Sequence, residues 1–220
     1  MKTALITGSE TFGKYITNPT KWLALAVDGK IINGHKIHSL IFPSVIRLPQ
    51  DAENHGEIIV KKAIKIKADV IISFGQASTA KGFRLESSAT NWIENNDYSA
   101  AYENKRRIDS AKPAHEKVEI DLKLWDLLTI RKSFAKKKIL FDSHISRNPG
   151  QYSCNAWIYR TVCALKKHKL NTPYLFVHTA CTKKAIEFIP NFPFTKKVLI
   201  KEKNLIEGLK IFLGSYLDKR

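Results

Sequence analysis

Cysteine is scarce in this sequence, and long apolar runs are missing. The three cysteines cannot all pair with one another, which excludes a fully paired disulfide framework. No run approaches the roughly 18 apolar residues of a membrane span. The apolar stretch near the N-terminus is too short for a secretory signal. We therefore expect a cytoplasmic protein with free thiols and no membrane contact.

Acidic residues are also few, because 20 Asp and Glu stand against 37 Lys and Arg, for a net charge of +17. So much positive charge attracts nucleic acids without specificity. The basic residues are dispersed in short groups, however, and do not alternate with aromatic residues as on a surface that stacks bases. We interpret them mainly as solvated surface, and a basic nucleic-acid-associated protein is the less favoured alternative.

The remaining composition is that of a folded chain, with 44% hydrophobic residues in a length of 220. This length suits a single domain over residues 1–220 with a sizeable core. Strand-like and helix-like segments alternate along it. Strands are expected at 2–7, 36–42, 69–74, 83–90, 139–141 and 174–178, and helices after Asn18, at 51–67, at 121–134, from Cys154 and at 205–217.

This alternation predicts an α/β fold, a three-layer α/β/α sandwich with a mixed, largely parallel central sheet. In such sheets, sites gather beyond the carboxyl ends of the strands. The polar stretch 91–115 has no clear period, and we expect short irregular strands or a functional flap there.

Cys154 stands where a turn leads into a helix. Pro149 and Gly150 mark the turn, and apolar residues recur at helical spacing after Cys154. A cysteine in the first turn of a helix faces unpaired N–H groups and the positive end of the helix dipole, which favour the nucleophilic thiolate. Taken alone, however, a cysteine is more often a small core residue.

Two further residues can complete a catalytic group with this cysteine. His178 ends one predicted strand, and Glu86 lies shortly beyond the end of another. A cysteine nucleophile needs a base, for which histidine is suited near neutral pH, and a carboxylate that orients the histidine. Each residue alone also has a structural interpretation, His178 as a strand-end histidine and Glu86 as a surface carboxylate.

A zinc site is a rival interpretation of the same region. Cys154, His178 and Cys181 would supply three ligands, but the sequence lacks a second pair of cysteines or histidines at ligand spacing. Cys163 lies nine residues after Cys154, half a turn out of phase on the same helix. We expect it to point away from Cys154 and to pack in the core.

Five motifs over nearly the whole chain resemble those of the pyroglutamyl peptidase I family of cysteine peptidases. They stand at 7–14 with 18–20, at 73–80, at 86–91, at 146–155 and at 176–180. The resemblance implies that Cys154 is the nucleophile, His178 the base and Glu86 the orienting acid. It implies removal of N-terminal pyroglutamate from peptides through a thioester, without metal or cofactor, by a homo-oligomer, a tetramer or a dimer.

The same resemblance suggests a substrate pocket. Phe12 would cover the flat lactam ring, and backbone groups of Gln76 and Ser153 would bind its amide. Tyr152 and Ser9 occupy further pocket positions.

Several residues depart from the family motifs. Ser9 stands in place of a pocket phenylalanine, and Thr11, Ala80, Ser87 and Ser153 also differ. Three aromatic side chains are candidates to refill the slot beside Ser9, namely Tyr15, Phe83 and Trp92. The departures leave open a retuned or inactive family member that binds peptide N-termini without cleaving them.

Overall fold

The computed structural model describes residues 1–12, 15–43, 54–93, 107–150, 152–186 and 199–217. Its centre is a six-stranded sheet with the strand order β2-β3-β1-β4-β8-β5. The strands are β1 (Lys2–Ser9), β2 (Ile31–Ile32), β3 (His35–Phe42), β4 (Val70–Gln76), β5 (Phe83–Glu86) and β8 (Tyr174–Thr179). The four inner strands are parallel, whereas β2 and β5 pair antiparallel at the two edges. The predicted mixed, largely parallel sheet is confirmed.

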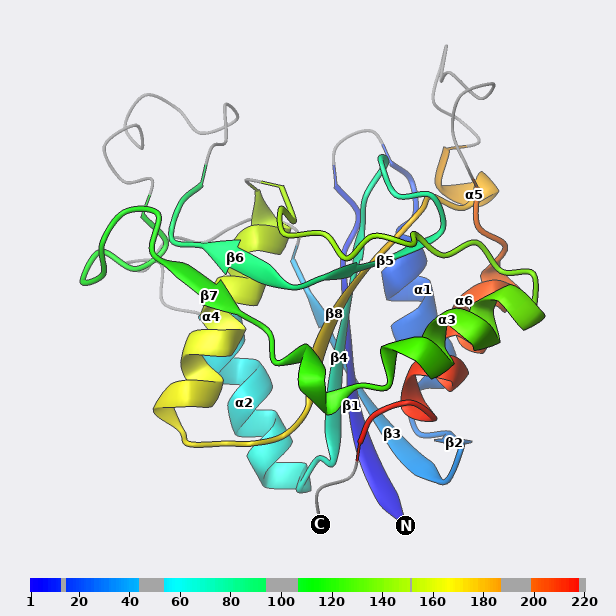
Figure 1. The fold of residues 1–220 in the computed structure, drawn as a ribbon, viewed down its shortest axis with the longest axis horizontal. Helices are drawn as coiled ribbons and strands as arrows, with labels where there is room; N and C mark the ends of the chain where they lie inside the picture. The colour runs from blue at the N-terminus through cyan, green and yellow to red at the C-terminus, as the bar shows by residue number, and fades with distance from the viewer. Residues whose placement is uncertain (13–14, 44–53, 94–106, 151, 187–198, 218–220) are drawn as a thin grey trace.

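Helices cover both faces of this sheet (Figure 1). One layer holds α2 (His55–Ile66) and α4 (Ser153–Lys167). The other holds α1 (Pro19–Val27), α3 (Leu127–Lys136) and α6 (Glu202–Leu213), and the short α5 (Lys183–Ile186) follows β8. Neighbouring strand residues such as Leu5 and Ile6 belong to two different apolar clusters, because successive side chains point to opposite faces. The predicted three-layer α/β/α sandwich is therefore confirmed.

Two asparagines fix where the first helices begin. The Asn18 side chain accepts a hydrogen bond from the backbone N–H of Thr20, and Pro19 takes the first helical position, as predicted. Asn54 accepts from Gly56 in the same way at the start of α2. The predicted start of that helix at Asp51 lies outside the described residues.

The prediction of a single strand over residues 83–90 is wrong. This stretch forms β5 and then β6 (Ser88–Thr90), which pairs with β7 (Lys117–Glu119) in a separate two-stranded sheet. The chain changes partner at Ser87, whose N–H donates to the carbonyl of Ser146 while its own carbonyl accepts from Ile120. These non-local bonds, which no local pattern encodes, divide the strand.

Three further predicted segments differ from the structure. The stretch 121–134 is a 3₁₀ turn over Leu122–Leu124 followed by α3, because Asp126 accepts from the N–H of Thr129 and starts a new helix. Residues 139–141 form no strand, and Phe141 makes only an isolated bridge with Phe83. The last helix ends at Leu213, not at Leu217. Of the polar stretch 91–115, residues 94–106 lie outside the described part, and the flap stays a prediction.

The parallel strands end together at one end of the sheet, whereas the N-terminus lies at the opposite end (Figure 1). The register places Ser9, Gln76 and Thr179 at the carboxyl ends of β1, β4 and β8. Among the described residues, no helix combines the length and the apolar character needed to cross a membrane. The edge with the carboxyl ends is where the predicted site residues meet.

Candidate active site

His178 and Glu86 come together across the antiparallel pair of β8 and β5. The Nδ1 atom of His178 lies 2.7 Å from Oε1 of Glu86, and the two side chains are 2% and 0% exposed. A carboxylate at Nδ1 fixes the tautomer in which Nδ1 carries a proton. The other ring nitrogen, Nε2, is then the atom that can exchange a proton with a reacting group.

Cys154 joins this pair beside Gly75 of β4. A methyl group on Gly75 would lie 3.1 Å from Sγ of Cys154, 3.1 Å from Cδ2 of His178 and 2.9 Å from the ring of Phe176. The sulfur and the imidazole therefore occupy the space that a side chain at this position would need. Cys154 is the second residue of α4, where the backbone N–H groups have no partner within the helix.

The electrostatics of the three side chains favour an ion pair. Burial lowers the pKa of His178, but Cys154 and Glu86 outweigh burial and raise that pKa to about 9. His178 is therefore protonated near neutral pH, with a carboxylate on one side and the cysteine sulfur on the other. This is the charge arrangement of an activated cysteine nucleophile.

Arg84 also belongs to the cluster, although the sequence analysis did not single it out. Its Nε donates to Oε1 of Glu86 at 2.8 Å, and its Nη2 lies 3.3 Å from Nδ1 of His178. Nη1 donates to Oγ1 of Thr79 at 3.3 Å. The signal was present, because residues two apart on a strand share a face, and Arg84 precedes Glu86 by two.

Gln76 ends β4 beside the cluster and leads to a second group of side chains. Its Nε2 donates to Sγ of Cys181 at 3.2 Å, while its Oε1 is buried without a hydrogen-bond partner among the described residues. Tyr15 packs edge-on against Phe12, with ring centroids 5.2 Å apart, and contacts Cys181. Burial raises the pKa of Tyr15, and Cys181 raises it further.

The zinc interpretation finds no support in this arrangement. Cys154 lies against Gly75, whereas Cys181 bonds to the next residue, Gln76, whose side chain leaves the opposite face of the strand. Among the described residues, no group of three or more His, Cys, Asp or Glu side chains could hold a metal ion. Cys163 is half-buried against the apolar cluster under α4, and burial raises the pKa of its thiol.

The predicted pocket residues fall into two sets. Phe12 and Tyr152 are 39% and 56% exposed, and Ser153 opens α4 immediately before Cys154. Ser9 is buried instead, and its hydroxyl accepts a hydrogen bond from Nδ2 of Asn18. Its hydroxyl thus supports the start of α1.

Of the three aromatic residues that could refill the slot beside Ser9, only Tyr15 contacts Phe12 in the described structure. Phe83 is fully buried and packs with Phe134 and Phe212 in the core on the side of α3 and α6. Trp92 lies over the ring of His115, 4.4 Å between centroids.

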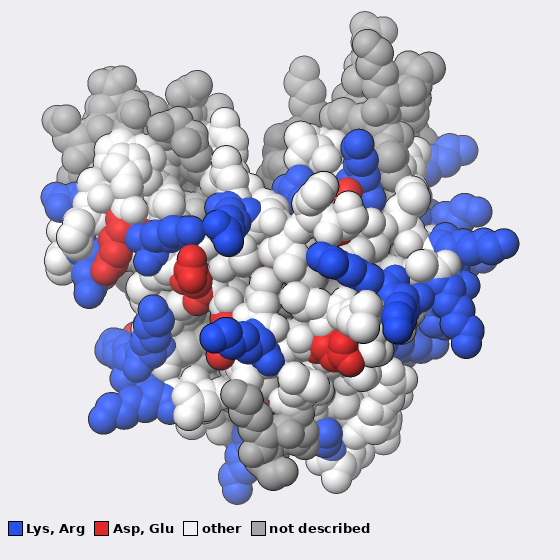
Figure 2. All heavy atoms as spheres, viewed as in Figure 1, with Lys and Arg blue, Asp and Glu red and all other residues white. Residues whose placement is uncertain are grey.

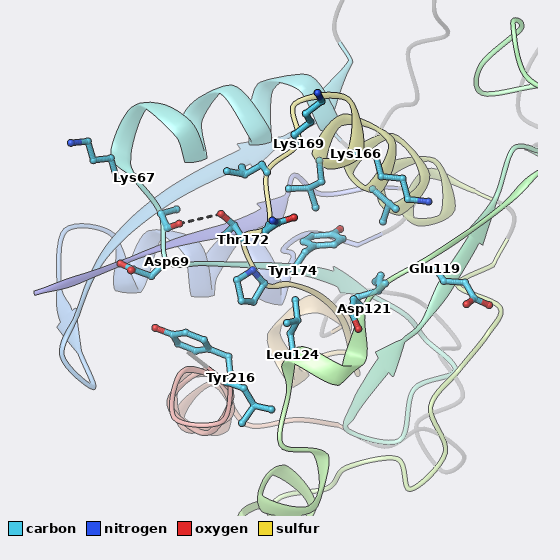
Figure 3. Close-up of a pocket in the computed structure, with 18 residues that line it drawn as sticks. Lys67, Asp69, Glu119, Asp121, Leu124, Lys166, Lys169, Thr172, Tyr174 and Tyr216 are labelled. Carbon is cyan, nitrogen blue, oxygen red and sulfur yellow. Dashed lines mark hydrogen bonds between the residues drawn. The ribbon is translucent and has the colours of Figure 1, made fainter. Parts of the chain in front are cut away.

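Two surface features lie apart from this cluster. A cavity of about 1060 Å³ opens at the opposite edge of the sheet, where β8 begins at Tyr174, and includes Lys67, Lys166 and Tyr216 in its lining (Figure 3). Figure 2 shows Lys and Arg side chains spread over the viewed face with acidic side chains between them. The candidate site therefore rests on its buried polar contacts and not on cavity size or surface charge.

The fold and the cluster together define a class of protein. A parallel α/β sheet brings a cysteine at a helix start, a histidine and a buried carboxylate to the carboxyl ends of its strands. Cysteine-type hydrolases use such a group, in which a base and an orienting acid serve the thiol.

Comparison with known proteins gives the family. The family model "Pyroglutamyl peptidase" matches residues 2–200, so the chain belongs to the pyroglutamyl peptidase family. A pyrrolidone-carboxylate peptidase of Thermococcus litoralis is 28% identical over 189 residues, 83% of this chain and 78% of that protein. Another, from Bacillus licheniformis, is 26% identical over 217 residues, 96% of this chain and 90% of that protein.

Solved structures agree with the fold. Pyrrolidone carboxyl peptidase from Thermococcus litoralis superposes with a TM-score of 0.75 at 22% identity, covering 97% of this chain and 92% of that one. Pyroglutamyl peptidase I from Bacillus amyloliquefaciens gives a TM-score of 0.75 at 20% identity, with 96% and 92% covered. At this level of identity, the likeness is one of fold.

Proposed function

We propose that the protein is a cysteine peptidase that removes N-terminal pyroglutamate from peptides. One observation carries the proposal, the buried 2.7 Å hydrogen bond between His178 and Glu86 beside the sulfur of Cys154. Membership of the pyroglutamyl peptidase family supports it, as do the names of the relatives, which are pyrrolidone-carboxylate peptidases.

The first half of the reaction forms a thioester. The Cys154 thiolate attacks the carbonyl carbon of the pyroglutamyl bond, and the carbonyl oxygen becomes an oxyanion. The N–H of Cys154, in the first turn of α4, is suited to bind that oxyanion. Nε2 of the His178 imidazolium gives its proton to the departing amine as the carbon–nitrogen bond breaks, and the amine product leaves.

The second half releases pyroglutamate. His178, now neutral, takes a proton from a water molecule, and the resulting hydroxide attacks the thioester carbonyl. The carbon–sulfur bond breaks, which regenerates the Cys154 thiolate and the imidazolium. Glu86 holds Nδ1–H of His178 by its hydrogen bond throughout both halves.

The lactam ring would lie against the aromatic pair of Phe12 and Tyr15. These rings pack edge-on, and Phe12 is partly exposed, so a flat apolar ring can rest on it. Oε1 of Gln76, a buried acceptor with no hydrogen-bond partner in the described part of the chain, suits the lactam N–H. Tyr152 and Ser153 would border the ring from the start of α4, and Ser9 would act through Asn18 at the base of the loop.

Release of coumarin from pyroglutamyl-aminomethylcoumarin tests this proposal. We expect the wild type to cleave the substrate and Cys154→Ala to be inactive, with Cys163→Ala as the matched control that keeps activity. Cleavage of alanyl- but not pyroglutamyl-coumarin would reject the substrate assignment. Binding of a pyroglutamyl peptide without turnover would favour the retuned family member. Assembly as a homo-oligomer and a cytoplasmic location stay predictions.

A further inference from the structure

We propose that Arg84 is a positioning residue of this site, which orients Glu86 and keeps the His178 imidazolium acidic enough to protonate the leaving amine. The inference rests on the proposed function for the identity of the leaving group. The charge coupling itself concerns only the side chains of the cluster and is testable without substrate.

The hydrogen bonds of Glu86 show that Arg84 orients its carboxylate. Oε1 of Glu86 receives two donors, Nε of Arg84 at 2.8 Å and Nδ1 of His178 at 2.7 Å. Oε2 is buried and has no hydrogen-bond partner among the described residues. The hydrogen bond from Arg84 therefore orients the carboxylate so that the same oxygen, Oε1, accepts from His178. Loss of Arg84 would leave a buried carboxylate with His178 as its remaining described partner.

The short approach of Arg84 to His178 follows from this shared oxygen. Nη2 lies 3.3 Å from Nδ1, but Nδ1–H donates to Glu86, so the two nitrogens are both donors and do not bond to each other. Nε of Arg84 and Nδ1 of His178 instead converge on one acceptor, Oε1 of Glu86. The far side of the guanidinium is anchored by Oγ1 of Thr79 at 3.3 Å, and the side chain is only 18% exposed.

Among the described residues, the charges next to the imidazole come from two of the helices and strands packed around it. Strand β5 contributes the Arg84 cation and the Glu86 anion, and α4 contributes Cys154. Strands β4 and β8 present Gly75 and Phe176, which carry no charge. Cation, anion, cation and anion thus alternate from Arg84 to the Cys154 thiolate. Removing Arg84 leaves an excess negative charge, which makes the imidazolium hold its proton more tightly.

The pH dependence of Cys154 alkylation by iodoacetamide, resolved by peptide mapping, tests this coupling. The rate should show two transitions, one as the thiolate–imidazolium pair forms and one as His178 loses its proton. In Arg84→Met, both should move to higher pH, by about one unit for His178, because a nearby cation is lost. Arg84→Lys retains the charge and should stay near the wild type. Arg131→Met removes an arginine of α3 that donates to the carbonyl of Ser143, and it should change neither transition.

A second set of variants should shift both transitions in the opposite direction. It keeps the inference testable if Arg84→Met alone does not fold. Glu86→Gln leaves Arg84 uncompensated and should move both transitions to lower pH, whereas Arg84→Met combined with Glu86→Gln should return close to the wild-type values. With pyroglutamyl substrate, Arg84→Met should lower kcat about tenfold and change KM little, because a weaker acid slows proton transfer.

The outcomes separate this inference from the proposed function. If both transitions shift as expected while the wild type fails to cleave pyroglutamyl substrates, the role of Arg84 stands and the substrate assignment falls. If the wild type cleaves but Arg84→Met leaves both transitions in place, the role of Arg84 is overturned. Equal shifts in Arg84→Met and Arg84→Lys would also overturn it, because side-chain shape rather than charge would then be responsible.

Discussion

Nδ1 of His178 and Oε1 of Glu86 lie 2.7 Å apart in a part of the core where neither side chain is more than 2% exposed. A buried histidine alone loses its proton readily, since the interior disfavours charge. Cys154 and the carboxylate together reverse this tendency and raise the pKa of His178, and the carboxylate holds the ring in one orientation. The consequences of this contact are measurable.

Replacement of Glu86 by alanine should lower kcat by about 100-fold or more, because the imidazole loses both its orientation and the stabilisation of its charged form. KM should change little, since Glu86 does not face the lactam ring. Steady-state kinetics on the coumarin substrate measure both. Glu119→Ala is the control, because that carboxylate is 72% exposed on β7. Equal kcat in the two variants would contradict the role of Glu86.

The pH profile of kcat/KM in the wild type should fall on the alkaline side near pH 9. The pKa of His178 is raised to about 9, so the imidazolium is present below that pH and is lost as the pH rises through it. Protonation of the leaving amine needs the imidazolium, hence the loss of rate. A profile that starts to fall near pH 6.5, the ordinary value for histidine, would show that Cys154 and Glu86 do not act on His178 as described.

Gly75→Ala should reduce kcat about 100-fold, because its methyl group would stand 3.1 Å from Sγ of Cys154 and from Cδ2 of His178 and would push the pair apart. Gly214→Ala is the matched control, since its nearest contact would be 3.4 Å and its φ is −88°. Thermal melts of both variants show whether the fold persists. A fully active Gly75→Ala would mean that the sulfur and the ring do not meet at this place.

Tyr15→Ala should raise KM for pyroglutamyl substrates while kcat stays nearly constant. The ring of Tyr15 supports Phe12, and losing an aromatic contact of this kind weakens binding by about 1–3 kcal/mol. The contact is equal in ground and transition states, so KM carries the effect. Tyr15→Phe keeps the ring and should behave like the wild type. A larger loss in Tyr15→Phe than in Tyr15→Ala would contradict this packing role.

Much of the candidate site could be proposed from the sequence because its residues lie at the ends of strands and helices with clear apolar patterns. His178 closes an apolar strand, and Cys154 opens a helix with clear apolar spacing. The carboxyl ends of parallel strands meet at one end of the sheet. The order of strands and helices along the chain was therefore enough to predict that these positions lie close together. Glu86 lies shortly beyond the end of a third predicted strand, and the family motifs point to the same carboxylate.

The parts that were missed depend on contacts between distant segments. The break at Ser87 comes from bonds to Ser146 and Ile120, and the start of α3 depends on the cap at Asp126. Arg84 looked like an ordinary basic residue until the register of β5 against β8 placed it opposite His178. Secondary-structure propensity is a property of one segment. The break at Ser87 and the position of Arg84 instead depend on how two segments pair.

The most direct test of the central claim is mass spectrometry of the wild type mixed with pyroglutamyl substrate and quenched in acid, followed by peptide mapping. A pyroglutamyl thioester should appear on the peptide that contains Cys154, and on neither the Cys163 peptide nor the Cys181 peptide. It should disappear in Cys154→Ala together with turnover. Turnover that continues in Cys154→Ala, or an adduct on Cys163 or Cys181 in its place, would contradict Cys154 as the nucleophile.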